Sequence, residues 1–460
     1  MKRVLTNLNL RIKEFLFNKK EGSFIKKELA FPKDLKYPDE CDFKFLKSDI
    51  DKKYCNNGLY IDILDFKAKK VIRYNMATIY YSRLIHIAKK VTSRKKFTKS
   101  DPFESYFNGH RIVPHMCHMT PTGFICASNT INIIYIDTNK DECSFLPEDY
   151  NKNLYLYNGS SDFSPDFKYW YFIRCCFKDY VKVINKEQKE MVYEICKLDL
   201  KEKKIETINT FNNAQVIHHV ACCKNDRYLS FAAYPTAPKI PYPTVPLEKD
   251  INGYSKTHKE GIEKGEIIIY DMDSQKFMKS EVPDPQPGHT EFDRIDKNVF
   301  YLFCHNFLFN TINNKLSRVL EGNASILKYK IEENKFQLID RYSDCDFYRL
   351  TQHSLFEKND KSLLVVSTTP FRLSIVNTNE MKLDRRVKVA PYPLPDLSKT
   401  GNAIAPADAP LTINLSKNKR YLLLGWAHEY CIYDYETNDF LDLRFSIGRR
   451  GLGHTSDIES

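Results

Sequence analysis

The chain has 460 residues, of which 42% are hydrophobic and 13% aromatic, enough for a sizeable core with a bias toward strands. The formal net charge is +11, but lysines along the whole chain produce it, so the charge does not indicate nucleic-acid binding. There is no run of eighteen apolar residues and no apolar signal core behind the basic N-terminus, so we expect neither a membrane span nor a secretory signal.

The cysteines indicate a reducing compartment. There are thirteen, an odd number, and none is arranged as C-x-x-C. Buried free thiols in a cytoplasmic protein are the interpretation that we favour.

The first 30 residues have the pattern of an amphipathic helix, with Leu5, Leu8, Ile12 and Phe15 near one face. We expect a basic arm and lead-in over residues 1–50 and a single folded domain over residues 51–460. The arm either packs on the edge of the domain or contacts a membrane surface or a partner.

One unit repeats along the domain: an apolar strand that ends in Asp or Asn, a polar turn, and a second strand. Glu266–Asp271 followed by 272–282 is the clearest copy. Asp137, Asp271 and Asp434 end such strands, which indicates a structural role in the turns. Seven copies, which start roughly 50 to 70 residues apart, are predicted at 59–74, 132–145, 195–208, 266–282, 326–342, 373–389 and 430–445.

Each of the last six copies is preceded by a strand that opens from a polar turn. With a further strand before that turn, each unit has four strands, which is one propeller blade. We expect residues 445–458 to complete the blade that begins near residue 55 and so to remove the edge strands. The six preceding strands are predicted at 121–128, 165–175, 225–234, 296–304, 359–367 and 417–426.

Two insertions interrupt the repeat. Residues 235–265 and 391–410 are rich in proline, which central strands do not tolerate. We expect both to be loops on one face of the domain, where loops commonly shape binding sites.

The turns resemble those of known propellers. The stretches 164–171 (SPDFKYWY) and 224–234 (KNDRYLSFAAY) are similar to the turn of WD40- and TolB-type blades. The resemblance implies an all-β fold, a single seven-bladed β-propeller with a short N-terminal helical arm. It does not identify a function, because this fold supports both scaffolds and enzymes.

The histidines are the most informative candidates for chemistry. There are twelve, and in several blades one falls shortly before the turn that leads into the core strand. Such positions lie on the innermost strand, so we expect these side chains to converge at the central channel. Converging imidazoles suit a divalent metal or a general base, but a His at this position can also brace a neighbouring blade. The histidines in question are His115, His218, His219, His289, His353 and His454.

Two enzyme families add to this interpretation. Residues 288–305, with Gly288-His289 and Phe303-Cys304-His305, resemble oligogalacturonate lyases, which implies a His/Gln-bound manganese and a His base. The order of His115, the 217–220 run (IHHV), residues 291–295 and His454 is similar to carotenoid oxygenases, which implies iron held by four histidines.

Two classes of function therefore remain open. The first is a propeller enzyme or ligand-binding protein, of lyase or oxygenase type, with a small molecule or saccharide in the channel. In it, His289 and His353 are catalytic, Arg294 and Arg372 bind substrate, and a divalent transition metal (Mn or Fe) is held by His115, His218, His219, His305 and His454. The second is a non-catalytic scaffold that binds a protein partner on the loop face, where the histidines only brace the blades.

Overall fold

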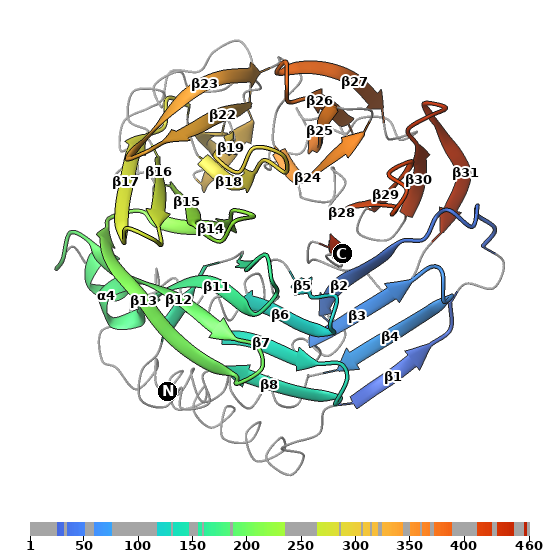
Figure 1. The fold of residues 1–460 in the computed structure, drawn as a ribbon, viewed down its shortest axis with the longest axis horizontal. Coiled ribbons are helices and arrows are strands. Elements are labelled where there is room, and N and C mark those ends of the chain that lie inside the picture. Colours follow the sequence, from blue (N-terminus) through green and yellow to red (C-terminus); the bar gives the residue numbers. More distant parts are fainter. Residues whose placement is uncertain are drawn as a thin grey trace. The chain divides into compact units, whose positions relative to one another are not determined.

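The computed structural model contains seven antiparallel sheets of four or more strands, and these are the blades of a seven-bladed β-propeller (Figure 1). It therefore confirms the all-β fold that the sequence predicts. The residues that the structure describes are 25–31, 35–50, 59–75, 117–129, 132–146, 155–158, 161–184, 187–234, 265–284, 287–304, 307–312, 315–320, 324–343, 350–358, 361–368, 372–388, 412–425, 430–445 and 455–457, some of them only as backbone.

The chain divides into two compact units. Unit 1 comprises Met1–Gly159, Asn414–Leu423 and Ala427–Ser460, and unit 2 comprises Ser160–Ile413 and Leu424–Trp426.

Unit 1 holds the first two blades and most of the last one. The first blade has the order β1-β4-β3-β2-β32, and the other two follow the chain; β9, also in this unit, is not a strand of these three sheets. The strands are β1 (Ile25–Leu29), β2 (Lys44–Ile50), β3 (Leu59–Asp65), β4 (Lys70–Asn75), β5 (Cys117–Met119), β6 (Phe124–Asn129), β7 (Asn132–Asp137), β8 (Glu142–Leu146), β9 (Tyr155–Tyr157), β28 (Thr412–Leu415), β29 (Tyr421–Gly425), β30 (Tyr430–Asp434), β31 (Asp439–Phe445) and β32 (Thr455–Asp457).

Unit 2 holds four blades, each with its strands in chain order from one edge to the other. The strands are β10 (Asp162–Phe163), β11 (Tyr169–Cys176), β12 (Met191–Asp199), β13 (Lys204–Asn213); β14 (Val216–Cys222), β15 (Tyr228–Tyr234), β16 (Glu266–Asp271), β17 (Lys276–Glu281); β18 (Pro287–Phe292), β19 (Val299–Cys304), β22 (Ser325–Glu332), β23 (Lys335–Ser343); and β24 (Leu350–Lys358), β25 (Lys361–Thr368), β26 (Arg372–Asn377), β27 (Lys382–Lys388).

The first blade is built from both ends of the chain. β32 pairs with β2, with Phe45 opposite Asp457 and Lys47 opposite Thr455. The C-terminal strand thus completes the first blade, as the sequence predicts. β1 adds a fifth strand beside β4. Strands of this blade therefore begin at residue 25, inside the segment predicted as arm and lead-in, while the helix expected before it lies outside the described residues.

The middle strands are apolar on both faces because neighbouring blades cover both sides. All six residues of β19 are buried. Phe300 and Leu302 pack with Ile267 and Ile269 of the preceding blade, whereas the alternate residues Tyr301 and Phe303 pack with Leu364 and Val366 of the next one. In unit 1, strands β2 and β3 pack in the same way against β29 and β30.

All seven predicted hairpins are present, and a strand-end side chain organises the turn in six of them. Asp271 accepts hydrogen bonds from the amides of Asp273 (3.0 Å) and Ser274, and Gln275 then takes a left-handed conformation, with φ of 57°. This local bonding confirms the structural role predicted for Asp137, Asp271 and Asp434. The six side chains are those of Asp65, Asp137, Asp199, Asp271, Asn377 and Asp434.

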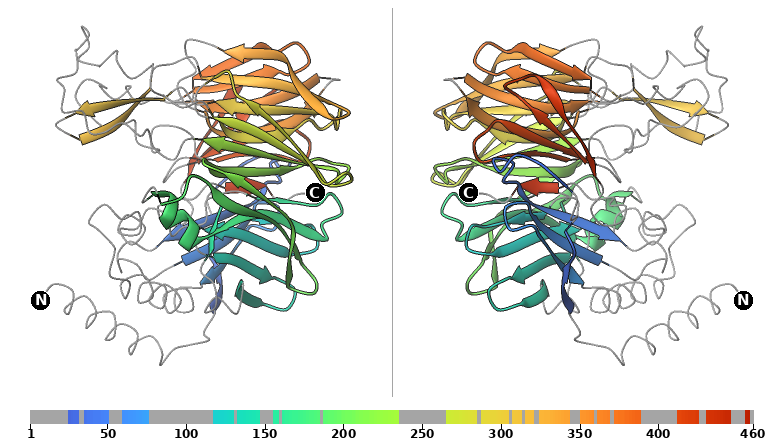
Figure 2. Two further views of the ribbon diagram at one scale, coloured as in Figure 1. Left: turned by 90° about the vertical axis from the view of Figure 1, so that its left-hand side faces the viewer. Right: turned by 90° about the vertical axis from the view of Figure 1, so that its right-hand side faces the viewer.

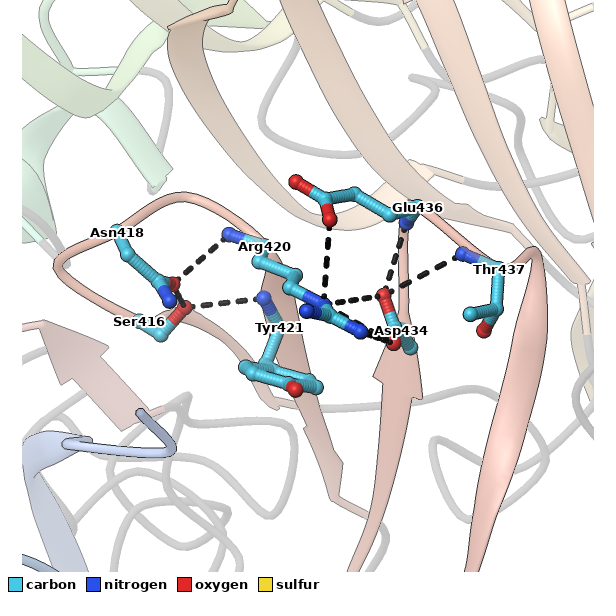
Figure 3. A network of polar contacts seen from close by, with 7 residues as sticks. All are labelled: Ser416, Asn418, Arg420, Tyr421, Asp434, Glu436 and Thr437. Atoms are coloured by element: carbon cyan, nitrogen blue, oxygen red, sulfur yellow. Dashed lines mark hydrogen bonds and ion pairs between the residues drawn. The ribbon is translucent and has the colours of Figure 1, made fainter. Parts of the chain in front are cut away.

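A second network ties the turn between the first two strands of a blade to the outer hairpin (Figure 3). Ser416 Oγ accepts the amide of Tyr421 at 2.9 Å, and the Arg420 guanidinium reaches across to Asp434, with Nη2 2.7 Å from Oδ2. In unit 2, Arg227 and Asp271 repeat this ion pair at 3.0 Å. Both kinds of turn therefore lie at one end of their blade, which we call the tight-turn end.

Two elements that the sequence did not predict leave from the other end of the blades, which we call the insertion end. They are the helix α4 (Phe177–Ile184), between β11 and β12, and the hairpin of β20 (Phe307–Ile312) with β21 (Lys315–Leu320), between β19 and β22. Both project from the same side of unit 2 (Figure 2). In the described part of the chain, no helix is long and apolar enough to cross a membrane.

We predict that Asp434→Asn lowers the free energy of unfolding by about 1 kcal/mol, because it weakens a charge-assisted hydrogen bond. Burial by itself raises the pKa of Asp434, but hydrogen bonds from Arg420 and from the amides of Glu436 and Thr437 outweigh it and lower the pKa. The stabilisation is therefore complete above the unfolded-state pKa of about 4 and is lost as the pH falls through the lower folded-state value.

Urea denaturation at pH 7 and at pH 3 measures this effect. We expect the difference between the two proteins to shrink at the lower pH. Glu436→Gln is the control, because that carboxylate lies 3.4 Å from Arg420 but is 51% exposed. A difference that does not change with pH would contradict the role of the charge.

Candidate functional site

Three of the predicted histidines lie together in unit 2. His219 is on β14, His289 on β18 and His353 on β24, the first strands of three successive blades. Their ring centroids are 4.8 Å apart for His219 and His289, 5.5 Å for His289 and His353, and 6.4 Å for His219 and His353. We call these residues the histidine trio.

A β-bulge precedes each member of the trio. The register along β14, β18 and β24 shifts between Ile217 and His219, between Pro287 and His289, and between Leu350 and Gln352. One extra residue in a strand changes the direction in which the following side chains point, and bulges of this kind are common beside functional sites. Here the repeated bulge accompanies three imidazoles whose ring centroids lie within 6.4 Å of one another.

The imidazole rings pack by their faces. His219 and His289 are stacked with an interplanar angle of 19°, and His353 is stacked on Phe303 at 4.2 Å between centroids. His219 and His289 are only 5% and 7% exposed, and the side chain of His353 is 9% exposed. Large parts of the ring surfaces are thus in contact with other rings.

Polar contacts define the state of His219. The amide of Thr290 donates to His219 Nδ1 at 3.4 Å, and Ser230 Oγ donates to Thr290 Oγ1 at 2.8 Å. Nδ1 can accept this hydrogen bond when the imidazole is neutral and carries its proton on Nε2. The bond joins β14 to β18 and so connects two blades.

The carboxylate of Glu291 lies beside the trio. Glu291 Oε2 lies 3.4 Å from His353 Nε2, and its side chain is 30% exposed. Glu291 follows His289 by two positions on β18. This carboxylate can orient the imidazole of His353, or pair with it when that imidazole is protonated.

The arrangement gives no support to the predicted metal site. An imidazole nitrogen binds a metal through a lone pair that lies in the plane of the ring. In two stacked rings these lone pairs point side by side rather than at a common centre. Among the residues whose placement is described, no group of three His, Cys, Asp or Glu side chains is arranged to hold a metal ion.

The other predicted site residues do not join the trio in what the structure describes. His115, His305 and His454 lie outside the described residues, and only the backbone of His218 and Arg372 is described. Arg294 is exposed on the turn after β18, at the tight-turn end, where its carbonyl accepts a hydrogen bond from Lys224. That Arg294 binds substrate therefore stays a prediction, and its position at the tight-turn end differs from that of His289 in the first half of β18.

Sequence reasoning gave no role in the site to Glu291, Thr290 or Phe303. A signal existed for Glu291, since residues two apart in a strand point to the same face. The position of Phe303 beside His353 depends on how two blades pack, and no local pattern shows it.

No protein-family model matches the chain, and no curated protein matches its sequence. Among solved structures, hydrazine synthase of Kuenenia stuttgartiensis is similar, with 12% identity, a TM-score of 0.46, and coverage of 73% of this chain and 87% of that chain. Sqt1 of Saccharomyces cerevisiae is similar with 10% identity, a TM-score of 0.46, and coverage of 73% and 76%. Likeness at this level carries no argument about the activity or partners of this chain.

We predict that His289→Ala lowers the free energy of unfolding by about 2–4 kcal/mol, because it leaves a cavity among buried rings. His289→Phe keeps the stacking surface and should cost less than half as much. Urea denaturation of both variants tests whether packing is the main role. Equal losses in the two variants would instead assign the stability to the polar contacts of the imidazole.

Proposed function

We propose that the protein is a non-catalytic propeller that binds a macromolecular partner at its insertion end. The observation that supports this proposal is the difference between the two ends of the blades in unit 2. At the tight-turn end the connections are short and closed by their own side chains. At the insertion end several connections are long, and two of these carry α4 and the β20–β21 hairpin.

The tight-turn end offers few groups for recognition. Its turns, such as 223–227 and 272–275, use their polar side chains internally: Asp271 binds its own turn and Arg227, and Cys223 accepts the amide of Tyr228. Groups that already satisfy the backbone have little left for a ligand.

The insertion end has the features of a recognition surface. The connections 177–190, 235–265 and 305–324 all leave from it, and they include α4 and the β20–β21 hairpin. Loops held by a rigid scaffold are where binding residues concentrate. The stacked, largely buried imidazoles fit the bracing role better than catalysis, which needs a group that a substrate can reach.

A variant without the β20–β21 hairpin tests the proposal. These two strands form a sheet of their own, so replacing residues 307–320 by a short glycine linker leaves the four strands of the blade in place. We expect the variant to keep its unfolding midpoint and to lose partners that the full chain captures from cell extract, as measured by cross-linking and mass spectrometry.

The matched control alters the tight-turn end. Arg294→Ala and Lys297→Ala change exposed residues between β18 and β19, in the same blade as the hairpin. We expect this control to capture the same partners as the full chain. If the hairpin variant retains every partner while the control loses them, recognition takes place at the tight-turn end and the proposal fails.

A second candidate function is ligand binding at the histidine trio, and the three bulges that precede its members favour it. Metal analysis of the purified protein distinguishes the two functions. We expect less than stoichiometric manganese or iron, unchanged in a His289→Ala, His353→Ala double variant. A stoichiometric metal that the double variant loses would favour the enzyme instead.

A further inference from the structure

We propose that β23 is a self-association edge, at which two copies of the chain pair their β23 strands about a two-fold axis through Gln337. β23 is the last strand of its sheet, and among the described strands none pairs with its outer edge. Such an edge presents backbone N–H and C=O groups to any strand that fits it.

The middle of β23 has exposed apolar side chains. Leu338 and Ile339 are 42% and 43% exposed, consecutive residues in the middle of the strand. Phe336, on the same face as Leu338, packs against the core cluster of buried residues that includes Tyr329 and Ile331. The apolar face of this blade thus extends onto its outermost strand, β23, and ends at Leu338.

A bulge determines which residues can face each other across the axis. On β22, Tyr329 pairs with Leu338 and Lys328 pairs with Asp340, so Ile339 is the extra residue. Lys335, Gln337 and Asp340 therefore share one face of β23, and Phe336 and Leu338 share the other. Without the bulge, Lys335 and Asp340 would point to opposite faces.

The antiparallel register centred on Gln337 is self-complementary on both faces. With Ile339 of each copy left out of the pairing as the extra residue, it places Lys335 opposite Asp340 of the second copy, and by symmetry Asp340 opposite Lys335 of that copy. On the other face, Phe336 lies opposite Leu338 of the second copy. Opposite charges and apolar pairs are the cross-strand combinations that stabilise antiparallel pairing, and the two-fold axis makes each pair occur twice.

The outer edges of β27 and β17 differ from that of β23. On β27, the cations Lys382, Arg385 and Arg386 dominate, so self-pairing brings like charges together. On β17, a register centred on Ser280 pairs Lys279 with Glu281 in both directions, but no large apolar side chain of this strand is exposed as Leu338 is. Cations on an edge are a usual means of preventing association, and β23 has none between Lys335 and Arg341.

Charge reversal on the full chain tests the proposal. Sedimentation velocity over a concentration series should show a monomer–dimer equilibrium. Lys335→Asp alone, or Asp340→Lys alone, places like charges opposite each other at two symmetric positions, and we expect the dissociation constant to rise about tenfold. The double variant restores opposite charges with the positions exchanged, and its dissociation constant should return to within about threefold of the original.

Lys382→Asp on β27 is the control for a general effect of charge and should leave the equilibrium unchanged. Leu338→Lys removes the apolar pair and should abolish the dimer. Three results would overturn the proposal: a chain that stays monomeric up to about 1 mM, a dimer that the single reversals do not weaken, or a double variant no stronger than the singles. Circular dichroism of each variant establishes that its fold is intact.

Discussion

The structure depends on the burial of each blade's middle strands between its two neighbours. In β19, alternate residues face the preceding and the following blade, so both faces of the strand are inside a core. A single blade would expose both faces to water and could not be stable by itself. This constraint also leaves the ends of the blades and the outermost strands as the main places for recognition.

Much of this architecture could be predicted because its signals are local. Each hairpin has a strand-end Asp or Asn that binds its own turn, or a short polar turn, and these patterns need no knowledge of distant residues. β1, α4 and the β20–β21 hairpin could not be predicted in this way. The sequence of β1 (IKKEL) is too polar to indicate a strand, and its conformation comes from pairing with β4. The strand propensity of its own residues is weaker than this tertiary contact.

The candidate site was predictable in position but not in chemistry. The place of His219, His289 and His353 before a turn put them on the first strands of their blades. Whether their nitrogens converge on one point or their rings stack depends on the bulges and on Phe303, which the neighbouring strand contributes. A contact between residues of different blades leaves no periodic trace in the sequence, so convergence of residue types does not establish convergence of donor atoms.

The third blade of unit 2 (β18, β19, β22 and β23) connects the features that matter for recognition. His289 and Glu291 lie on its first strand, the β20–β21 hairpin leaves between its second and third, and Leu338 is exposed on its last. A partner at the hairpin and a second copy at β23 would therefore contact one sheet at different places, the end of its strands and its outer edge. Because the backbone groups that β23 offers are not those that hold the hairpin, neither contact needs to displace the other.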